Sequence, residues 1–409
     1  MMLMRLIVAS IVARKTMALL TCFSIAISML VLLSVAHIEA QVRHNFERSV
    51  SGVDLIVGSR TSQLNLLLFS IFKIGYPSNN LQWQSFATIK ANPQVDWAVP
   101  ISMGDSHQGY GVVGTTQDYF SQLKYADKQP LVFVTGKYFE NDFDVVLGSS
   151  VAKELDYALG HEIVLAHGAG KVSFTQHKQH PFAVVGVLKA TGTPIDRSIY
   201  IPIQSVEILH NPGAHQNEHE AEHADTNQTL SAVIVGAKNR VAILSLQRSL
   251  SQFEAEPLTA IIPGLALREL WQMMSTVELS LRVISILVLF ASLIGMTTML
   301  LASMRERRHE LSVLRALGAR PWLILLLVEG EALLLTFVGC ILAYVLLCSG
   351  LYLLEPVLLS KYSFSLQVYP DGTLFINYVL LALVLATLLA LLPAISAYTK
   401  SLKSGLSFG

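Results

Sequence analysis

Four stretches of the chain are almost wholly apolar. A transmembrane helix needs roughly 20 apolar residues to cross about 30 Å of hydrocarbon. The qualifying stretches are Thr16–Ala36, Val283–Met304, Ala332–Leu354 and Leu374–Tyr398. We therefore predict four membrane-spanning helices. The apolar run Leu64–Ile74 is too short to span and predicts a buried or interfacial helix instead.

Between the first two spans, short alternating runs of apolar residues are interleaved with helical patterns, which predicts an α+β domain of two lobes. The expected strands are Val53–Val57, Trp97–Ile101, Tyr110–Val113, Leu131–Val134, Val145–Leu147, Ile163–Leu165, Val172–Phe174, Phe182–Leu188 and Ile199–Ile201. The expected helices are Leu64–Ile74, Leu81–Ala91, Thr116–Leu123, Ser150–Leu159 and Val241–Phe253. Trp271–Leu281 lacks helix breakers and predicts a continuous helix, or stalk, into the second span.

Lysine and arginine gather in the short flanks on one side of the membrane, and such flanks face the cytoplasm. These basic residues are Arg5, Arg14, Lys15, Arg305, Arg307, Arg308, Arg315, Arg320, Lys400 and Lys403. The loop after the third span carries only Lys361. We therefore expect a multi-pass protein of a bacterial inner membrane, with cytoplasmic termini and a large periplasmic domain.

The fold class that we predict is a membrane protein of four transmembrane α-helices, with a large α+β periplasmic domain inserted between helices 1 and 2. The predicted order is a cytoplasmic segment 1–15, a first helix 16–38, a periplasmic domain 39–272, a stalk and second helix 273–304, a cytoplasmic helix 305–320, a third helix 321–354, a periplasmic loop 355–373, a fourth helix 374–399 and a tail 400–409. The alternative for the first helix is a cleaved signal peptide, with Ile38-Glu39-Ala40 as the cleavage site. Its apolar core is longer than the ~7–15 residues of that class.

Composition supports a membrane protein with a soluble insert. Of the 409 residues, 52% are hydrophobic and 14% are charged, and the formal net charge is zero. Soluble domains usually carry about 25% charged residues. All three cysteines, Cys22, Cys340 and Cys348, lie in apolar stretches, so the periplasmic domain has no disulfide and depends on a packed core.

Small residues recur at every fourth position of the fourth span, at Ala382, Ala386, Ala390 and Ala394. Such a stripe lets a second helix approach closely, either within this chain or in a second copy. Glu329 and Glu331 stand near the start of the third span. We interpret them as snorkelling to the interface, with an ion relay as the alternative.

Residues 210–228 have no large apolar side chain and predict an exposed loop. Within this loop His215, His219 and His223 recur at every fourth position among acidic residues, and they are our candidate zinc ligands. The alternative interpretation is a solvated loop that happens to be rich in histidine.

Several catalytic patterns are missing from the sequence. It has no G-x-x-x-x-G-K-[ST] phosphate loop, so it encodes no ATPase of that type. His161-Glu162 followed by His167 has the wrong spacing for a zincin helix. We therefore predict a non-catalytic chain with no intrinsic cofactor.

The segment Met304–Trp322 predicts a short amphipathic helix on the cytoplasmic face. Gly318 suits a C-cap and Pro321 suits the first turn of the following helix. Such a helix fits a docking site for a soluble partner, and the alternative is an ordinary positive-inside anchor. Physical reasoning alone leaves the two open.

The motif Arg307-x-x-Glu310, followed by Leu314-Arg315-Ala316-Leu317-Gly318-Ala319, resembles the signature loop of the FtsX/MacB/LolC permeases. These are transmembrane subunits of type VII ABC systems. The stretch from Phe182 to Arg197 is similar to the periplasmic core of MacB-like members, and the topology of one span, a large domain and three more spans agrees.

This resemblance implies a coupling helix that contacts a separate ABC ATPase subunit, which would use the ATP. The contact residues would be Arg305, Arg307, Arg308, Glu310, Leu314, Arg315, Ala316 and Gly318. It also implies that the chain forms a dimer with a second copy or a paralogue. The other partners would be the lipid bilayer and a periplasmic protein or cargo, and we expect no nucleic acid. Three functions follow: export or extraction of a peptide, lipoprotein or other hydrophobic cargo by mechanotransmission, an FtsX-like signal relay, or assistance to zinc uptake.

Overall fold

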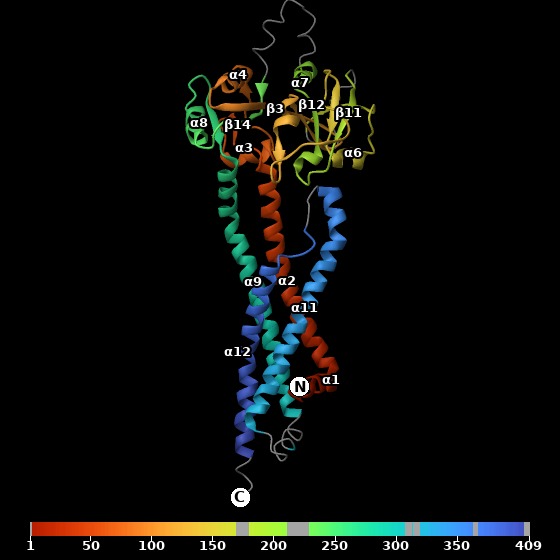
Figure 1. Cartoon of the computed structure of the whole chain (residues 1–409), viewed down its shortest axis with the longest axis vertical. Helices are drawn as coiled ribbons and strands as arrows, with labels where there is room; N and C mark the ends of the chain where they lie inside the picture. The colour runs from red at the N-terminus through yellow and green to blue at the C-terminus, as the bar shows by residue number, and fades with distance from the viewer. Residues whose placement is uncertain are drawn as a thin grey trace, which may run out of the picture. The chain divides into compact units, whose positions relative to one another are not determined.

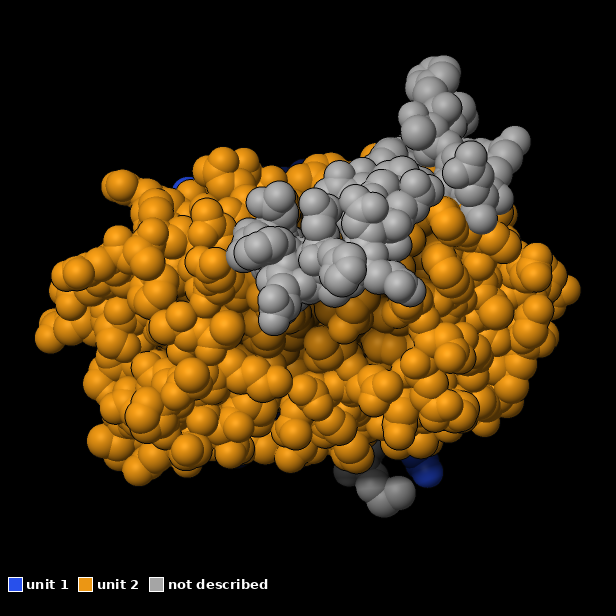
Figure 2. All heavy atoms as spheres, turned by 90° about the horizontal axis from the view of Figure 1, so that it is seen from above, with its two compact units in different colours: residues 1–41, 275–354, 367–409 blue, residues 42–274, 355–366 orange. Residues whose placement is uncertain are grey.

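The structure is a computed structural model that describes residues 2–168, 180–210, 229–306, 313, 320–362 and 367–404. It divides into a helical unit and a second unit, the domain, shown in different colours in Figure 2. The helical unit contains residues 1–41, 275–354 and 367–409, and the domain contains residues 42–274 and 355–366.

The helical unit is built from apolar helices, most of them long (Figure 1). They are α1 (Met2–Ala13), α2 (Lys15–Val50), α9 (Pro263–Glu306), α11 (Pro321–Tyr362) and α12 (Gly372–Ser404). All except α1 are long and apolar enough to cross a membrane, which confirms the four predicted spans. Both α2 and α9 continue without a break into the domain unit, so Trp271–Leu281 is helical as predicted.

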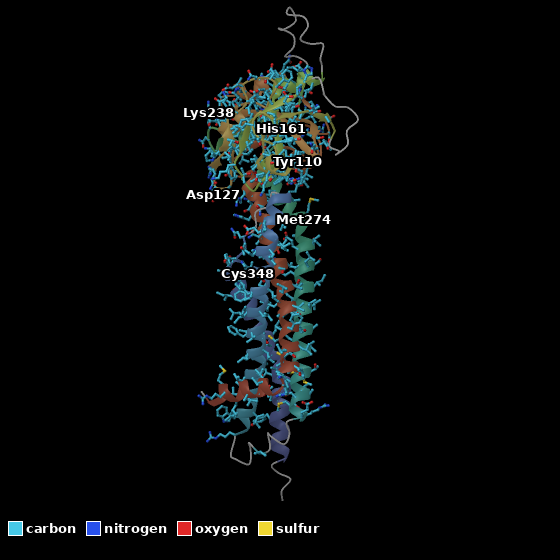
Figure 3. All side chains as sticks on the ribbon, turned by 90° about the vertical axis from the view of Figure 1, so that its right-hand side faces the viewer. Tyr110, Asp127, His161, Lys238, Met274 and Cys348 are labelled. Carbon is cyan, nitrogen blue, oxygen red and sulfur yellow. The ribbon has the colours of Figure 1, made fainter. Side chains whose placement is uncertain are left out.

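Close packing joins these helices. Ile25 of α2 lies against Gly339 of α11, where an added Cβ would come within 2.9 Å of its side chain. The Thr336 hydroxyl of α11 donates a hydrogen bond of 3.6 Å to the sulfur of Met296 on α9. Cys348 also lies on α11 (Figure 3).

One sheet of eleven strands organises the domain. Its main path has the order β15-β1-β14-β3-β4-β12-β8-β11-β7, while β10 pairs with β3 and β9 pairs with β11. The strands are β1 (Leu55–Ser59), β3 (Val95–His107), β4 (Tyr110–Thr115), β7 (Phe133–Gly136), β8 (Asp144–Leu147), β9 (Glu162–Ile163), β10 (Ala166–His167), β11 (Phe182–Leu188), β12 (Ser198–Pro202), β14 (Ala232–Ala237) and β15 (Leu258–Ile261).

Shorter elements complete the domain. They are α3 (Gln63–Ser70), β2 (Leu81–Gln82), α4 (Trp83–Ala91), α5 (Asp118–Gln122), β5 (Lys124–Tyr125), β6 (Gln129–Pro130), α6 (Ser149–Leu155), the 3-10 helix η1 (Pro194–Arg197), α7 (Ile203–His210), β13 (Thr229–Leu230) and α8 (Ala242–Ser251).

Alternation along the strands gives the sheet two apolar faces. Ile56 belongs to a core shared with α3 and the start of α9, whereas Leu55 and Val57 belong to a core shared with α4 and α8. The first core continues across the whole sheet, and the opposite face holds a separate cluster around Val145 and α6. One continuous path of strands therefore runs through the domain in which we expected two lobes, and one core follows it.

Most predicted elements are present, with shifted ends. The run Leu64–Ile74 contributes α3, whose Leu66 and Leu67 are fully buried in the domain core. The expected strand Val172–Phe174 lies outside the described residues. Our prediction missed β14 and β15, which pair with β1 in the described sheet.

Candidate functional site

Helices α2 and α9 contact each other through an aromatic cluster inside the domain. The ring centroids of Phe46 and Trp271 are 5.5 Å apart with edge-to-face geometry, and those of Phe46 and Phe72 are 4.4 Å apart. The Arg43 guanidinium lies 5.3 Å from the centre of a Trp271 ring, within cation–π range. We call Arg43, Phe46, Phe72 and Trp271 the aromatic clasp.

The same two helices also meet within the helical unit. The Arg282 guanidinium of α9 donates to both carboxylate oxygens of Glu39 on α2, at 3.0 and 2.8 Å. Further along, the hydroxyls of Ser24 and Ser292 are 2.9 Å apart. Polar contacts thus hold α2 and α9 together in one unit and the aromatic clasp holds them together in the other.

The carboxyl end of α2 is attached to the domain by its backbone and side chains. The Ala126 N–H donates to the Arg48 carbonyl at 2.9 Å, and the Ser51 hydroxyl donates to the Ala126 carbonyl. The Arg48 guanidinium reaches the Thr191 carbonyl at 3.4 Å. The bonds from Arg48, and that from Ser51 just after α2, therefore attach this helix end to two loops of the domain.

The Asp196 carboxylate binds the backbone of the Thr191 loop. The Asp196 carboxylate, 1% exposed, accepts hydrogen bonds of 2.8 Å from the N–H groups of Thr191 and Gly192 and from the Thr191 hydroxyl. Burial raises the pKa of this carboxyl, and the bonds from Thr191 and Gly192 oppose that shift. These residues lie in the stretch from Phe182 to Arg197 that carried the resemblance described above.

A second polar cluster lies at the start of α11. The Ser10 hydroxyl of α1 donates to the Glu331 carboxylate, and the Arg14 guanidinium lies 3.8 Å from the same carboxylate. Glu331 and Glu329 are only 5% and 8% exposed, so our interpretation that they snorkel to the interface is wrong. Protein atoms bury both, and Glu331 lies where α1 packs on α11.

The alanine stripe of α12 is fully buried. Ala382, Ala386, Ala390 and Ala394 are each 0% exposed within a single copy of the chain. Helices of this chain therefore cover the stripe already, whichever surface a second copy would use.

Other predicted site residues lie outside the described part of the chain. They are His215, His219, His223, Arg307, Arg308, Glu310, Leu314, Arg315, Ala316 and Gly318. Arg305 is described, at the exposed end of α9. Among the described residues no three metal-ligating side chains stand together, and Glu162 lies in β9, which excludes the zincin helix.

Sequence reasoning missed the aromatic clasp and the Ser10–Arg14–Glu331 cluster. The clasp combines residues from distant segments, and nothing in the local pattern around Phe46 or Trp271 pairs them. A polar Ser10 and a basic Arg14 four residues apart, next to an apolar run, were a signal that the first residues form a helix with one polar face.

Two family models match this chain. The MacB-like periplasmic core domain matches residues 17–253, which is more than half of the chain, and the FtsX-like permease C-terminal domain matches residues 282–402. The chain belongs to the FtsX/MacB-like ABC transporter permeases. Members of this family are generally non-catalytic and work with ABC ATPase partners.

The matches confirm the resemblance seen in the sequence. The permease combines four helices that can span a membrane with a periplasmic-type domain between the first and second, which fits a bacterial inner-membrane protein. No curated protein matches the permease.

Solved structures similar to the permease are periplasmic or extracellular domains. The periplasmic region of MacB from Actinobacillus actinomycetemcomitans is 14% identical, with a TM-score of 0.35, and the match covers 55% of the permease and 97% of that region. The extracellular domain of the noncanonic ABC-type transporter YknZ from Gram-positive bacteria is 16% identical, with a TM-score of 0.32 and coverage of 51% and 98%.

Proposed function

We propose that the permease transmits movements of a separate ATPase subunit to its periplasmic domain, which then exports or extracts a peptide, lipoprotein or other hydrophobic cargo. In this proposal the termini and residues 305–320 are cytoplasmic, as the basic flanks indicate. The segment 305–320 contacts the ATPase, and the permease acts as a dimer with a second copy or a paralogue.

The continuity of α2 and α9 supports this proposal most directly. Each is one uninterrupted helix that begins in one unit and ends in the other, and the pair is joined in both. A helix held by backbone hydrogen bonds at every turn is stiff along its axis, so displacement at one end reaches the other. The bonds from Arg48 and Ser51 then carry it into the loops around Thr191 and Ala126.

A helix-breaking substitution tests this mechanism. Val277 lies on α9 and is 50% exposed, so a proline there removes a helix hydrogen bond without creating a core cavity. We expect Val277→Pro to leave binding of the ATPase subunit intact but to abolish ATP-dependent distance changes in the domain. These distances are measured between spin labels on a permease reconstituted with its co-purifying ATPase. Val277→Ala is the matched control.

The proposed contact of residues 305–320 with the ATPase is tested separately. Glu310→Ala and Arg315→Ala should each reduce stimulation of the ATPase by the permease. If both variants stimulate the ATPase like the unmodified permease, residues 305–320 are not the coupling element.

A further inference from the structure

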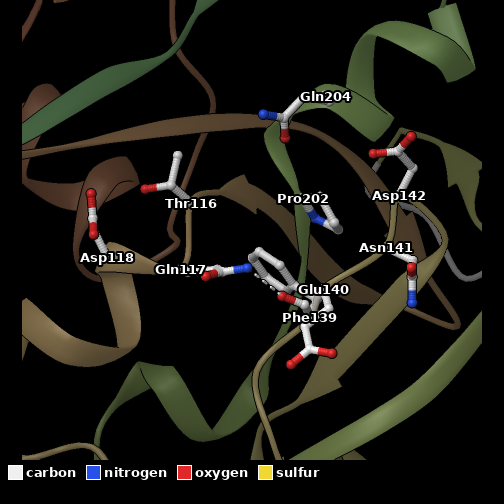
Figure 4. A pocket seen from close by; sticks show the side chains of 9 residues that line it. All are labelled: Thr116, Gln117, Asp118, Phe139, Glu140, Asn141, Asp142, Pro202 and Gln204. Atoms are coloured by element: carbon white, nitrogen blue, oxygen red, sulfur yellow. Dashed lines mark hydrogen bonds between the residues drawn. The ribbon is translucent and has the colours of Figure 1, made fainter.

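A polar pocket lies at the carboxyl ends of two parallel strands in the domain (Figure 4). Strand β12 pairs with β4 in parallel, and the register places Pro202 opposite Thr115. The antiparallel pair of β12 and β8 brings the residues before Asp144 to the same edge. Ligands of open α/β sheets commonly bind at such an edge, outside the carboxyl ends of parallel strands.

The pocket has a cavity of about 430 Å³. It is lined by Thr116, Gln117, Asp118, Phe139, Glu140, Asn141, Asp142, Pro202 and Gln204. Volumes of this order are typical of sites for small molecules and short peptide segments.

Hydrogen bonds hold the loop on one side of the pocket in a fixed shape. The Asp144 carboxylate accepts from the N–H groups of Glu140 and Asn141 at 2.9 and 2.8 Å. The Gln117 amide donates to the Phe139 carbonyl at 3.0 Å, and the Ser205 hydroxyl donates to the Asp142 carbonyl. A ligand would therefore meet a preformed surface and would not have to order the loop.

The lining combines negative charge with amide groups. Asp118 and Glu140 each have a lysine nearby, since Lys90 lies 4.0 Å from Asp118 and Lys137 lies 2.5 Å from Glu140. In the described part of the chain no side chain pairs with the carboxylate of Asp142. The pocket thus has three carboxylates and two nearby lysines, which leaves one net negative charge and favours a cation.

The amide side chains give the pocket hydrogen-bonding groups as well as charge. Gln117, Asn141 and Gln204 carry both N–H donors and a carbonyl acceptor, which is the hydrogen-bonding pattern of a peptide group. The Gln117 and Asn141 amides each donate one hydrogen bond within the domain, to the Phe139 carbonyl and the Asp144 carboxylate, so each offers a ligand its second N–H and its carbonyl oxygen. The Phe139 ring and Pro202 also border the pocket (Figure 4), but both are buried in the domain, and the Phe139 ring packs on Phe120.

From this arrangement we infer that the pocket binds an extended peptide segment through a lysine or arginine side chain, whose charged end meets Asp142 and whose backbone meets the three amides. A metal ion fits less well, because no group of three metal-ligating side chains stands together among the described residues. Binding of the peptide to this pocket needs no ATPase, so it can be measured on the permease alone.

Calorimetric titration of the full permease in detergent tests the ligand class. The probes are three capped tripeptides, acetyl-Ala-Arg-Ala-amide, acetyl-Ala-Gln-Ala-amide and acetyl-Ala-Glu-Ala-amide, together with spermidine. We expect the arginine peptide to bind at least about fivefold more tightly than the glutamine peptide, which corresponds to about 1 kcal/mol for an exposed charge pair. We expect the glutamate peptide not to bind. Equal binding of the first two peptides, or no binding up to about 1 mM, overturns the proposal.

Two variants with opposite expected effects place the ligand in this pocket. Asp142→Asn should weaken the arginine peptide about fivefold, and Gln204→Glu should strengthen it by a similar factor. A gain of affinity cannot result from misfolding. Asp96→Asn, an exposed acid on β3, is the control and should change nothing.

Three other outcomes contradict the proposal. If Asp142→Asn and Gln204→Glu shift affinity in the same direction, or if Asp96→Asn matches Asp142→Asn, the peptide binds elsewhere or by general charge attraction. If spermidine binds as tightly as the arginine peptide, the pocket recognises charge alone and the peptide assignment is wrong.

Discussion

Arg282 of α9 forms an ion pair with Glu39 of α2, in which the guanidinium nitrogen Nη2 donates to both carboxylate oxygens, at 3.0 and 2.8 Å. Because a single nitrogen makes both bonds, the pair does not use the parallel two-nitrogen geometry by which arginine can bind a carboxylate. The Arg282 side chain is 45% exposed and that of Glu39 is 20% exposed, so water screens part of the attraction.

We predict a coupling energy of about 0.5–1 kcal/mol between these two residues. A double-mutant cycle of Glu39→Gln, Arg282→Met and the double variant, followed by thermal unfolding in detergent, measures it. Glu39→Asp is the conservative control, which keeps the charge but shortens the reach. Strictly additive effects of the two single changes would show that the pair contributes nothing to α2–α9 pairing.

Gly52 lies two residues after the end of α2, within the domain. A Cβ at this position would lie 2.2 Å from the Lys124 carbonyl oxygen, which belongs to the backbone and cannot rotate away. We predict that Gly52→Ala destabilises the domain by about 1–3 kcal/mol, since the loop must shift to make room. Denaturant unfolding of the permease measures this loss.

Gly111→Ala is the control for Gly52. An added Cβ at Gly111 meets no atom within 4 Å, so the same chemical change should have little effect there. If the two alanine variants unfold at the same denaturant concentration, close packing at Gly52 does not limit stability.

The spans and many strands could be predicted because their causes are local. An uninterrupted run such as Val283–Met304 must be helical in lipid, since every backbone polar group needs a partner within the segment. The alternation in Phe182–Leu188 gives the strand β11 with the bounds that we expected. Such patterns depend on neighbours a few residues apart.

The clasp, the buried glutamates and the pocket could not be predicted, because they depend on which distant segments meet. Trp271 reaches Phe46 only once α2 and α9 pair, and Glu331 becomes buried only when α1 packs on α11. The pocket joins Thr116 and Pro202 through the register of β4 and β12, and a shift of one residue would remove it.

Glu329 and Glu331 should respond to neutralisation in opposite ways. Glu331 has the Ser10 hydroxyl and the Arg14 guanidinium as neighbours, so Glu331→Gln should destabilise the helical unit by about 1–3 kcal/mol. Both carboxylate oxygens of Glu329 are buried without a hydrogen-bond partner in the described part of the chain. Glu329→Gln should therefore be neutral or stabilising. Thermal unfolding in detergent compares the two, and a shift in the same direction for both contradicts this assignment.

Lys73 should make the stability of the domain depend on pH. Its ammonium donates to the Ser70 carbonyl at 2.6 Å, and burial lowers the pKa of Lys73 to about 7. In the unfolded chain the pKa returns to about 10.4, so between these values the unfolded state binds more protons and folding becomes more favourable as pH rises. The gain is at most about 1.4 kcal/mol per pH unit and ends where the unfolded lysine also loses its proton.

Substitution of Lys73 tests this linkage. Lys73→Met should raise the unfolding midpoint at pH 7 and flatten the rise between pH 7 and 9, because the variant has no ammonium to bury. Lys153→Met, at an exposed position on α6, should leave the pH profile unchanged. If the Lys73→Met and Lys153→Met profiles coincide with that of the unmodified permease, the Lys73 ammonium is not buried in the folded domain.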